Sequence, residues 1–219
     1  NPTANPTPNP TTNPTGNLIP QGCSAATASE ADQLVACNYI RIPELQACFA
    51  IQHVTLDFTA EQIPTQIGLL TQLLSLKISH DLSEGTIPTT IGCLTQLEYL
   101  SLPNNRFKGT IPSTLGLLTG LVGLFIESNT LTGTIPSSIV SLTLLQGMSL
   151  SRNKLIGTIP SFIGSMSFLT NLDLTHNQLT GTIPTFLESM VSLQGIILSN
   201  DNLKGTVSRF MVLSCLHQG

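Results

Sequence analysis

The chain has 219 residues, of which only 9% are charged and none is tryptophan, and its formal net charge at pH 7 is −4. An ordinary soluble domain carries about 25% charged residues, so this surface must consist largely of Thr, Ser, Asn and Gln side chains. The small net charge and the lack of a basic stripe exclude a typical nucleic-acid-binding protein, and no apolar run approaches the roughly 18 residues of a membrane-spanning helix. The chain has no initiator Met and no signal-like segment, so we expect a mature or partial product that has lost any targeting segment.

Residues 1–21 form a Pro- and Thr-rich arm that begins with four tetrapeptides, NPTA, NPTP, NPTT and NPTG. Such a tract cannot build a hydrophobic core and is expected to be extended and polyproline-like. Asn-Pro-Thr does not accept N-glycans because Pro occupies its middle position, but Thr beside Pro is typical of O-glycosylated stalks. The candidate sites of glycosylation or proline hydroxylation are Thr3, Thr7, Thr11, Thr15, Pro2, Pro6, Pro10 and Pro14. The alternative is a plain spacer between domains.

Residues 22–53 are predicted to be an N-terminal cap with a short helix near residues 29–36. Three of the five cysteines fall in this segment, which is typical of a secreted module held by disulfides. Cys37–Cys48 is the preferred bridge, although a sequence alone does not fix connectivity. The odd count leaves at least one thiol free or bonded to another molecule. Cys93 is expected to be a small buried hydrophobe.

Residues 54–208 contain a repeat that is clearest in Leu97–Pro112, LEYLSLPNNRFKGTIP. Ile-Pro pairs recur every 24 residues from Ile63-Pro64 to Ile183-Pro184. A period of about 20–29 residues with this leucine spacing indicates a leucine-rich repeat solenoid. We therefore predict an α/β solenoid, a right-handed curved superhelix of about seven 24-residue repeats with a parallel sheet on its concave face. Residues 209–219 are predicted to be a short C-terminal cap.

Three positions of the repeat explain how such a turn folds. Leucines at the spacing L-x-x-L-x-L point inward, and alternate residues between them face solvent. An Asn follows each strand where the chain turns away, and its amide can satisfy buried backbone groups. This asparagine ladder comprises Asn105, Asn129, Asn153 and Asn177, with Asp81 and Asp201 in the same position at the two ends. A Gly before each Ile-Pro pair permits backbone angles that other residues resist.

The segment L-x-G-x-I-P followed by Ile-Gly or Leu-Gly resembles the plant-type leucine-rich repeat family. That family includes receptor-kinase ectodomains and polygalacturonase-inhibiting proteins, and the resemblance extends over residues 54–216. It implies a secreted solenoid with a helical cap, although the Trp common in such caps is absent. These motifs specify a fold far better than a function, because one fold hosts many functions.

The concave face is the usual binding surface of a solenoid, and exposed aromatic side chains are typical anchors of binding surfaces. The candidate concave residues are Lys77, Tyr99, Ser101, Phe125, Ser149, Asn171, Asp173, His176 and Ile197. Glycines in the neighbouring column, at 123, 147 and 195, are expected to make the middle of this face thin. Two aromatic residues also occur there easily by chance.

No catalytic motif is present, and the four histidines are too scattered for a metal site, so we predict neither enzymatic activity nor a cofactor. Asp173 and His176 would form a carboxylate–histidine pair without a nucleophile. The simpler interpretation is that both are solvated residues on a polar face.

Every Gly-x-Ile-Pro segment reads Gly-Thr-Ile-Pro, which gives a threonine ladder of Thr86, Thr110, Thr134, Thr158 and Thr182, continued by Thr206. Stacked turns would place these threonines about 4.8 Å apart. A flat ladder of this kind could bind ice or pack laterally against a second copy. The alternative is that Thr simply suits an exposed strand edge.

Three functions follow from these patterns. The first is an extracellular structural glycoprotein of a wall, matrix or fibril, which assembles with itself through the solenoid and the glycosylated arm. The second is a module that binds another extracellular protein or a carbohydrate, such as a receptor-like ectodomain or an inhibitor of a wall-degrading enzyme. The third is an ice-binding protein that uses the threonine ladder.

Overall fold

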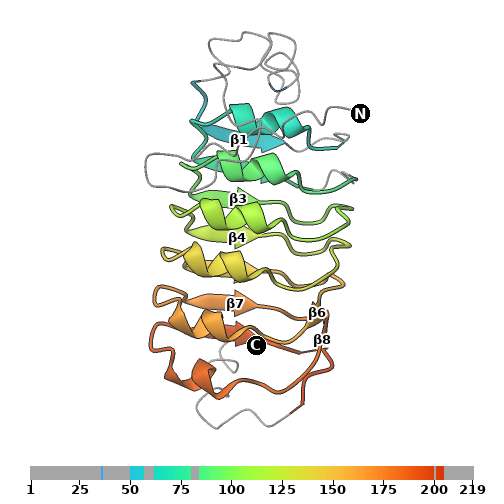
Figure 1. Ribbon diagram of the computed structural model, residues 1–219, viewed down its shortest axis with the longest axis vertical. Coiled ribbons are helices and arrows are strands. Elements are labelled where there is room, and N and C mark those ends of the chain that lie inside the picture. Colours follow the sequence, from blue (N-terminus) through green and yellow to red (C-terminus); the bar gives the residue numbers. More distant parts are fainter. Residues whose placement is uncertain (1–35, 37–49, 57–61, 80–83, 200, 205–219) are drawn as a thin grey trace, which may run out of the picture.

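The computed structural model describes residues 36, 50–56, 62–79, 84–199 and 201–204. Successive turns stack into an elongated column, with a parallel sheet on one side and short helices on the other (Figure 1). This confirms the predicted solenoid. The predicted arm and C-terminal cap, and nearly all of the N-terminal cap, lie outside the described residues.

Seven strands form the main sheet in chain order, and every neighbouring pair is parallel. Its strands are β1 (His53–Leu56), β2 (Ser75–Ile78), β3 (Tyr99–Ser101), β4 (Gly123–Phe125), β5 (Gly147–Ser149), β7 (Asn171–Asp173) and β9 (Gly195–Ile197). Two further strands, β6 (Ile156–Gly157) and β8 (Gln178–Leu179), pair in parallel at one edge of the column. The register advances by one repeat from strand to strand, so equivalent residues of each turn form columns across the sheet.

The opposite side of each turn is a 3-10 helix that begins directly after the Pro of the Ile-Pro pair. These helices are η1 (Thr65–Leu69), η2 (Thr89–Cys93), η3 (Ser113–Leu117), η4 (Ser137–Ser141), η5 (Ser161–Ser165) and η6 (Thr185–Ser189). Proline has φ fixed near −65°, and Pro88 before η2 has φ −69°. Each Pro therefore orients the chain to enter the helix.

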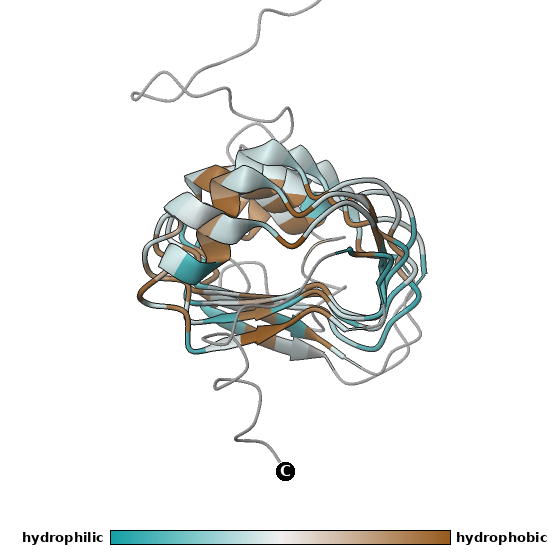
Figure 2. Cartoon of the chain, turned by 90° about the horizontal axis from the view of Figure 1, so that it is seen from below, coloured by the Kyte–Doolittle hydropathy of each residue, from teal (hydrophilic) through white to brown (hydrophobic). Residues whose placement is uncertain are grey.

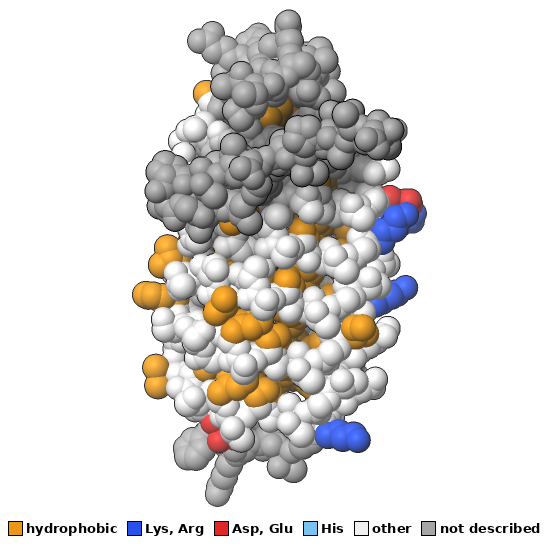
Figure 3. Space-filling view, in the orientation of Figure 1, with side chains coloured by type: hydrophobic (Ala, Val, Ile, Leu, Met, Phe, Trp, Pro, Cys, Tyr) orange, Lys and Arg blue, Asp and Glu red, His pale blue; other side chains and the backbone are white. Residues whose placement is uncertain are grey.

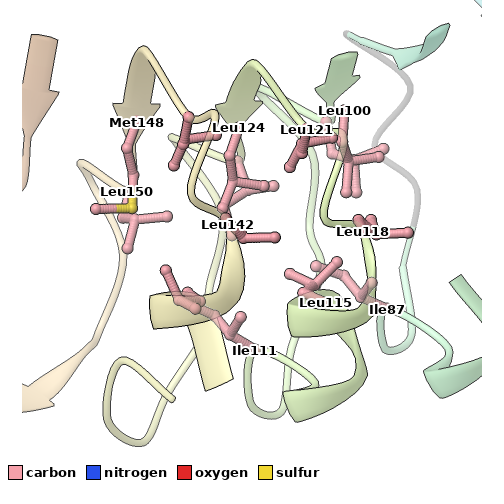
Figure 4. Packing of buried hydrophobic residues seen from close by; sticks show 14 of the residues in the cluster. Ile87, Leu100, Ile111, Leu115, Leu118, Leu121, Leu124, Leu142, Met148 and Leu150 are labelled. Carbon is pink, nitrogen blue, oxygen red and sulfur yellow. The ribbon is translucent and has the colours of Figure 1, made fainter. Parts of the chain in front are cut away.

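The core lies between the sheet and the 3-10 helices (Figure 2). Leu100, Leu124 and Met148 point inward from the strands, while Leu115 and Ile111 approach from the helical side (Figure 4). All five are at most 5% exposed. Each turn contributes only a slice of this core, so burial requires neighbouring turns on both sides.

The five described glycines of the Gly-Thr-Ile-Pro segments have positive φ, between 77° and 89°. This confirms that the position needs a backbone conformation that glycine adopts freely. A second set of positive φ values, near 55°, occurs immediately before each asparagine of the ladder, at Asn104, Ser128, Arg152 and His176. The sequence did not indicate this set, since Ser and Arg are not typical of that region.

The asparagine ladder performs the predicted role. The Asn153 side-chain amide donates to the carbonyls of Ile126 at 3.0 Å, Leu150 at 3.1 Å and Ser151 at 3.2 Å. Its Oδ1 accepts the backbone N–H of Leu131, in the preceding turn, at 3.0 Å. Each ladder residue therefore links its own turn to the one before it.

Asp201 reproduces only half of this pattern. Its Oδ1 accepts the N–H groups of Asn177 and Leu179 at 3.1 Å. A carboxylate cannot donate, and Oδ2 is buried without a hydrogen-bond partner among the described residues. Burial raises the pKa of Asp201 above its ordinary value, although the hydrogen bonds from Leu179 and Asn177 lower it.

The substitution Asp201→Asn is expected to stabilise the protein at neutral pH. Because the folded state raises this pKa, it binds the proton more tightly than the unfolded chain does, and stability falls as pH rises from the ordinary pKa through the raised one. The amide removes that loss and restores the donor. The site is partly exposed, so we expect a gain of about 1 kcal/mol or less. Denaturant unfolding of both proteins at pH 4 and pH 7 measures it, and a gain that is equal at both pH values would contradict the explanation.

The 3-10 helices η1, η2 and η3 pack closely against their neighbours because each has Gly as its fourth residue. A Cβ added at Gly92 would lie 2.5 Å from the Thr114 carbonyl oxygen and 2.8 Å from the Thr114 Cβ. Thr114 in turn donates its hydroxyl to the Thr89 carbonyl at 2.6 Å. These contacts bring neighbouring helices together at the backbone.

Cys93, at the end of η2, is buried as expected but is also disulfide-bonded. It is the only cysteine within the described residues, so its partner lies outside them. The interpretation of Cys93 as a simple hydrophobe is therefore incomplete, and the Cys37–Cys48 bridge stays a prediction.

Candidate binding faces

The predicted concave residues lie on the solvent side of the seven-stranded sheet, in two adjacent columns. The first column contains Tyr99 and Asn171, and the second contains Lys77, Ser101, Phe125, Ser149, Asp173 and Ile197. His176 is exposed but lies in the turn beyond β7. The side chains of Tyr99 and Ile197 are 45% and 49% exposed.

Two aromatic rings converge on one glycine in this face. A Cβ at Gly123 would be 2.7 Å from Phe125 Cε2 and 2.9 Å from Tyr99 Cδ1, and a Cβ at Gly147 would be 3.1 Å from Phe125 Cζ. The rings therefore occupy the space that a larger residue at either glycine would need. We call Tyr99 and Phe125, with Gly123 and Gly147 beneath them, the aromatic patch. The sequence predicted that these glycines make the middle of the face thin, and in the structure Gly123 and Gly147 form the floor of this patch.

A small group of polar and acidic side chains adjoins the aromatic patch. Burial raises the pKa of Glu127, and the nearby Asp173 carboxylate raises it further, whereas hydrogen bonds from its backbone and from Ser149 lower it. Glu127 Oε2 is buried and has no hydrogen-bond partner among the described residues. It is thus an unfilled acceptor close to the aromatic patch.

Asp173 is already engaged within its own turn. Its Oδ1 accepts the Thr175 hydroxyl at 2.8 Å and the Thr175 backbone N–H at 3.0 Å. This arrangement gives Asp173 a structural role in the turn after β7. Within the described ranges, no cluster of three or more His, Cys, Asp and Glu side chains is placed to hold a metal ion.

The threonine ladder lies on a different face, at the edge that carries β6 and β8. Its five described members are all exposed. The Cγ2 methyl group of a ladder threonine lies against the glycine of the next turn. A Cβ added at Gly157, for example, would be 3.0 Å from Thr134 Cγ2. The distance is also about 3 Å for Thr86, Thr110 and Thr158. The methyl groups of these four threonines therefore pack on a glycine. The hydroxyls of the five described ladder threonines make no hydrogen bond to another described residue.

Charged side chains lie mainly at the edges of the helical side, whose surface is mostly uncharged (Figure 3). One ion pair is present among the described residues, between Arg106 and Glu84 at 3.3 Å, and both partners are exposed. Such a surface pair contributes little to stability. The low charge predicted from composition is thus visible on this side of the column.

None of the predicted modification sites of the arm lies within the described residues, and the same holds for Cys37, Cys48 and Thr206. Across the described ranges, no helix has the length and apolar character needed to cross a membrane.

A model of the Leucine Rich Repeat family matches residues 96–118, 144–166 and 168–190. The chain is 33% identical to the plant peptide hormone receptor RGFR1, solved in complex with RGF2, with a TM-score of 0.68 over 71% of this chain. It spans only 25% of that receptor chain. Comparison with curated proteins gave no match.

Two other solved structures are informative. The ectodomain of the receptor kinase SOBIR1 from Arabidopsis thaliana is 31% identical with a TM-score of 0.56, over 59% of this chain and 71% of that one. A plant ice-binding protein is also 31% identical, with a TM-score of 0.64 over 74% of this chain and 51% of that one. Repeat motif, fold and identity agree, and the chain belongs to the plant-type leucine-rich repeat family.

Proposed function

We propose that this protein is an extracellular, non-enzymatic binding module that holds an extended protein segment against its sheet face. The observation that carries this proposal is the aromatic patch. Tyr99 and Phe125 are large apolar side chains on a solvent-facing sheet, and the glycines beneath them let both rings settle on the backbone. Aromatic anchors of this kind dominate the binding energy of many interfaces.

The relatives support the same conclusion. One of them is a peptide hormone receptor in complex with RGF2, and another is a receptor-kinase ectodomain. An extracellular location is further supported by the disulfide at Cys93, because disulfides persist mainly in oxidising compartments.

The substitution Phe125→Ser is expected to weaken ligand binding by about tenfold or more, since loss of an aromatic anchor typically costs above 1 kcal/mol. The probe is a set of 12-residue peptides selected from a displayed random library against the whole protein and then titrated by calorimetry. Phe168→Ser is the matched control, because Phe168 is an exposed aromatic residue, 54% accessible, that lies outside the sheet strands. Failure to enrich any peptide, or equal affinity for the Phe125→Ser variant, would reject the proposal.

Ice binding through the threonine ladder is a second candidate function. It is favoured by the row of exposed threonines with free hydroxyls and fixed methyl groups, and by the similarity to a plant ice-binding protein. The methyl packing also gives these threonines a structural role that needs no ligand, and lateral packing against a second copy stays a prediction.

If the ladder binds ice, Thr134→Lys should abolish most of the thermal hysteresis of the protein, because a long charged side chain would interrupt a flat surface at its middle turn. Thermal hysteresis is measured with Thr143→Lys as the control, since Thr143 is exposed but lies outside the ladder. Absence of hysteresis in the unmodified protein would eliminate this function.

A structural role in a wall, matrix or fibril depends on the arm and on the ends of the solenoid. The arm, the C-terminal cap and nearly all of the N-terminal cap lie outside the described residues, so self-assembly and glycosylation stay predictions.

A further inference from the structure

We propose that the ligand-binding sheet face recognises the protein's own N-terminal arm, residues 1–16, which binds in an extended conformation along the solenoid axis with its prolines on the aromatic patch. This inference rests on the proposed binding function of that face and names the segment it holds. It is argued from the sequence of the arm and from the described geometry of the sheet.

When the arm is fully extended, its two sides differ in polarity. On docking, the arm would pass from its polyproline-like form to a strand-like form, in which alternate residues point to opposite sides. All odd positions from 1 to 15 are Asn or Thr, whereas the even positions hold the four repeated prolines together with Ala4, Pro8, Thr12 and Gly16. One face would therefore be largely apolar. The other would carry every Asn and the candidate threonine sites Thr3, Thr7, Thr11 and Thr15, which docking would leave in solvent, whereas the four repeated prolines would face the sheet unmodified.

The spacing of the prolines matches the spacing of apolar groups on the sheet. Prolines four residues apart in an extended chain are separated by about 13 Å, at about 3.3 Å per residue. Phe125 and Ile197 share one column and are separated by three strand steps, through Ser149 and Asp173. Three steps correspond to about 14 Å at the usual strand spacing. One proline on the aromatic patch thus brings the next proline close to Ile197.

The chemistry of the two surfaces also agrees. Proline rings pack on aromatic faces, as they do where aromatic-lined surfaces recognise proline-rich segments. The arm contains no charged side chain, and the aromatic patch contains none. The backbone N–H groups of the arm are neutral donors, and they would pass over Ser149 and Asp173, which lie between Phe125 and Ile197 on the same face.

The experiment uses the whole chain with the arm prolines Pro2, Pro6, Pro8, Pro10 and Pro14 replaced by Ala, so that the resident arm does not compete. A synthetic, unmodified peptide with the sequence of residues 1–16 is titrated into this protein by calorimetry. We expect binding that weakens at least tenfold when Phe125→Ser is added and changes less than twofold when Phe168→Ser is added. A peptide with Ala in place of its prolines should bind at least tenfold more weakly than the native peptide.

Two results would overturn the inference: no binding of the native peptide, or binding that Phe125→Ser leaves unchanged. The displayed-library peptides separate this failure from failure of the proposed function. If they bind through Phe125 while the arm peptide does not, the face binds another partner and only the arm is rejected. If neither binds, the binding function of the face is rejected as well.

Discussion

Replacing Asn153 by alanine is expected to lower the free energy of unfolding by about 2–3 kcal/mol. The substitution removes the acceptor of the Leu131 N–H and the donor to the carbonyls of Ile126, Leu150 and Ser151. Asn153 is only 8% exposed, so water cannot replace these partners without opening the turn. The Leu131 N–H would be left buried without a partner, and such a group costs about 1–3 kcal/mol. The three carbonyls would each lose one donor but keep another, from Asn129, Asn177 and the Ser128 N–H. Equilibrium unfolding in guanidinium chloride measures the loss.

Two further variants distinguish the effect of breaking the asparagine ladder from the effect of removing any Asn side chain. Asn171→Ala removes an exposed Asn from the neighbouring strand column, and we expect a change within about 0.5 kcal/mol. Asn153→Asp keeps the acceptor for Leu131 but places a carboxylate against carbonyl oxygens. Its folded-state pKa should be raised, so its stability should increase as pH falls through that pKa. A similar loss for Asn153→Ala and Asn171→Ala would show that the ladder does not hold the turns together.

The sequence was sufficient to predict the structural features that recur in every turn. The buried leucines, the asparagine ladder and the positive-φ glycines each repeat at 24 residues, so one correct assignment fixes the whole column. The structure places Asn153 and Gly133 where the repeat predicted them, with the predicted hydrogen bonds and backbone conformation. The 24-residue period predicts these positions because every turn buries equivalent side chains and makes equivalent hydrogen bonds.

Features that depend on a single turn were not predictable in the same way. The sequence showed Gly123 and Gly147 as missing side chains, but it did not show that the Phe125 ring would lean across both of them. The available signal was a glycine two residues before Phe125 on its own strand and another in the next turn. Cys93 was misjudged for a related reason. It lies in the repeat and not in the cysteine-rich cap, so nothing in its local pattern indicated a disulfide.

The tight packing of the 3-10 helices leads to the second large effect. Gly92→Ala is expected to destabilise the protein by about 3 kcal/mol, because the new Cβ would meet backbone and Cβ atoms of Thr114 at 2.5 and 2.8 Å. A backbone contact can be relieved only by moving the adjacent turn, and overpacking of this kind typically costs about 1–3 kcal/mol or more. Thermal and denaturant unfolding of the variant measure the change.

Gly164→Ala is the matched control, since Gly164 occupies the same position in η5 that Gly92 occupies in η2. The intrinsic preference of Ala over Gly is therefore the same in both variants and cancels in the comparison. At Gly164 the nearest atoms belong to the Phe186 ring, at 2.9 and 3.1 Å, and a side chain can rotate away where a backbone cannot. We expect a loss below about 1 kcal/mol, because Gly→Ala without a backbone clash is neutral or mildly stabilising. Equal losses in the two variants would mean that backbone contact between turns does not limit this position.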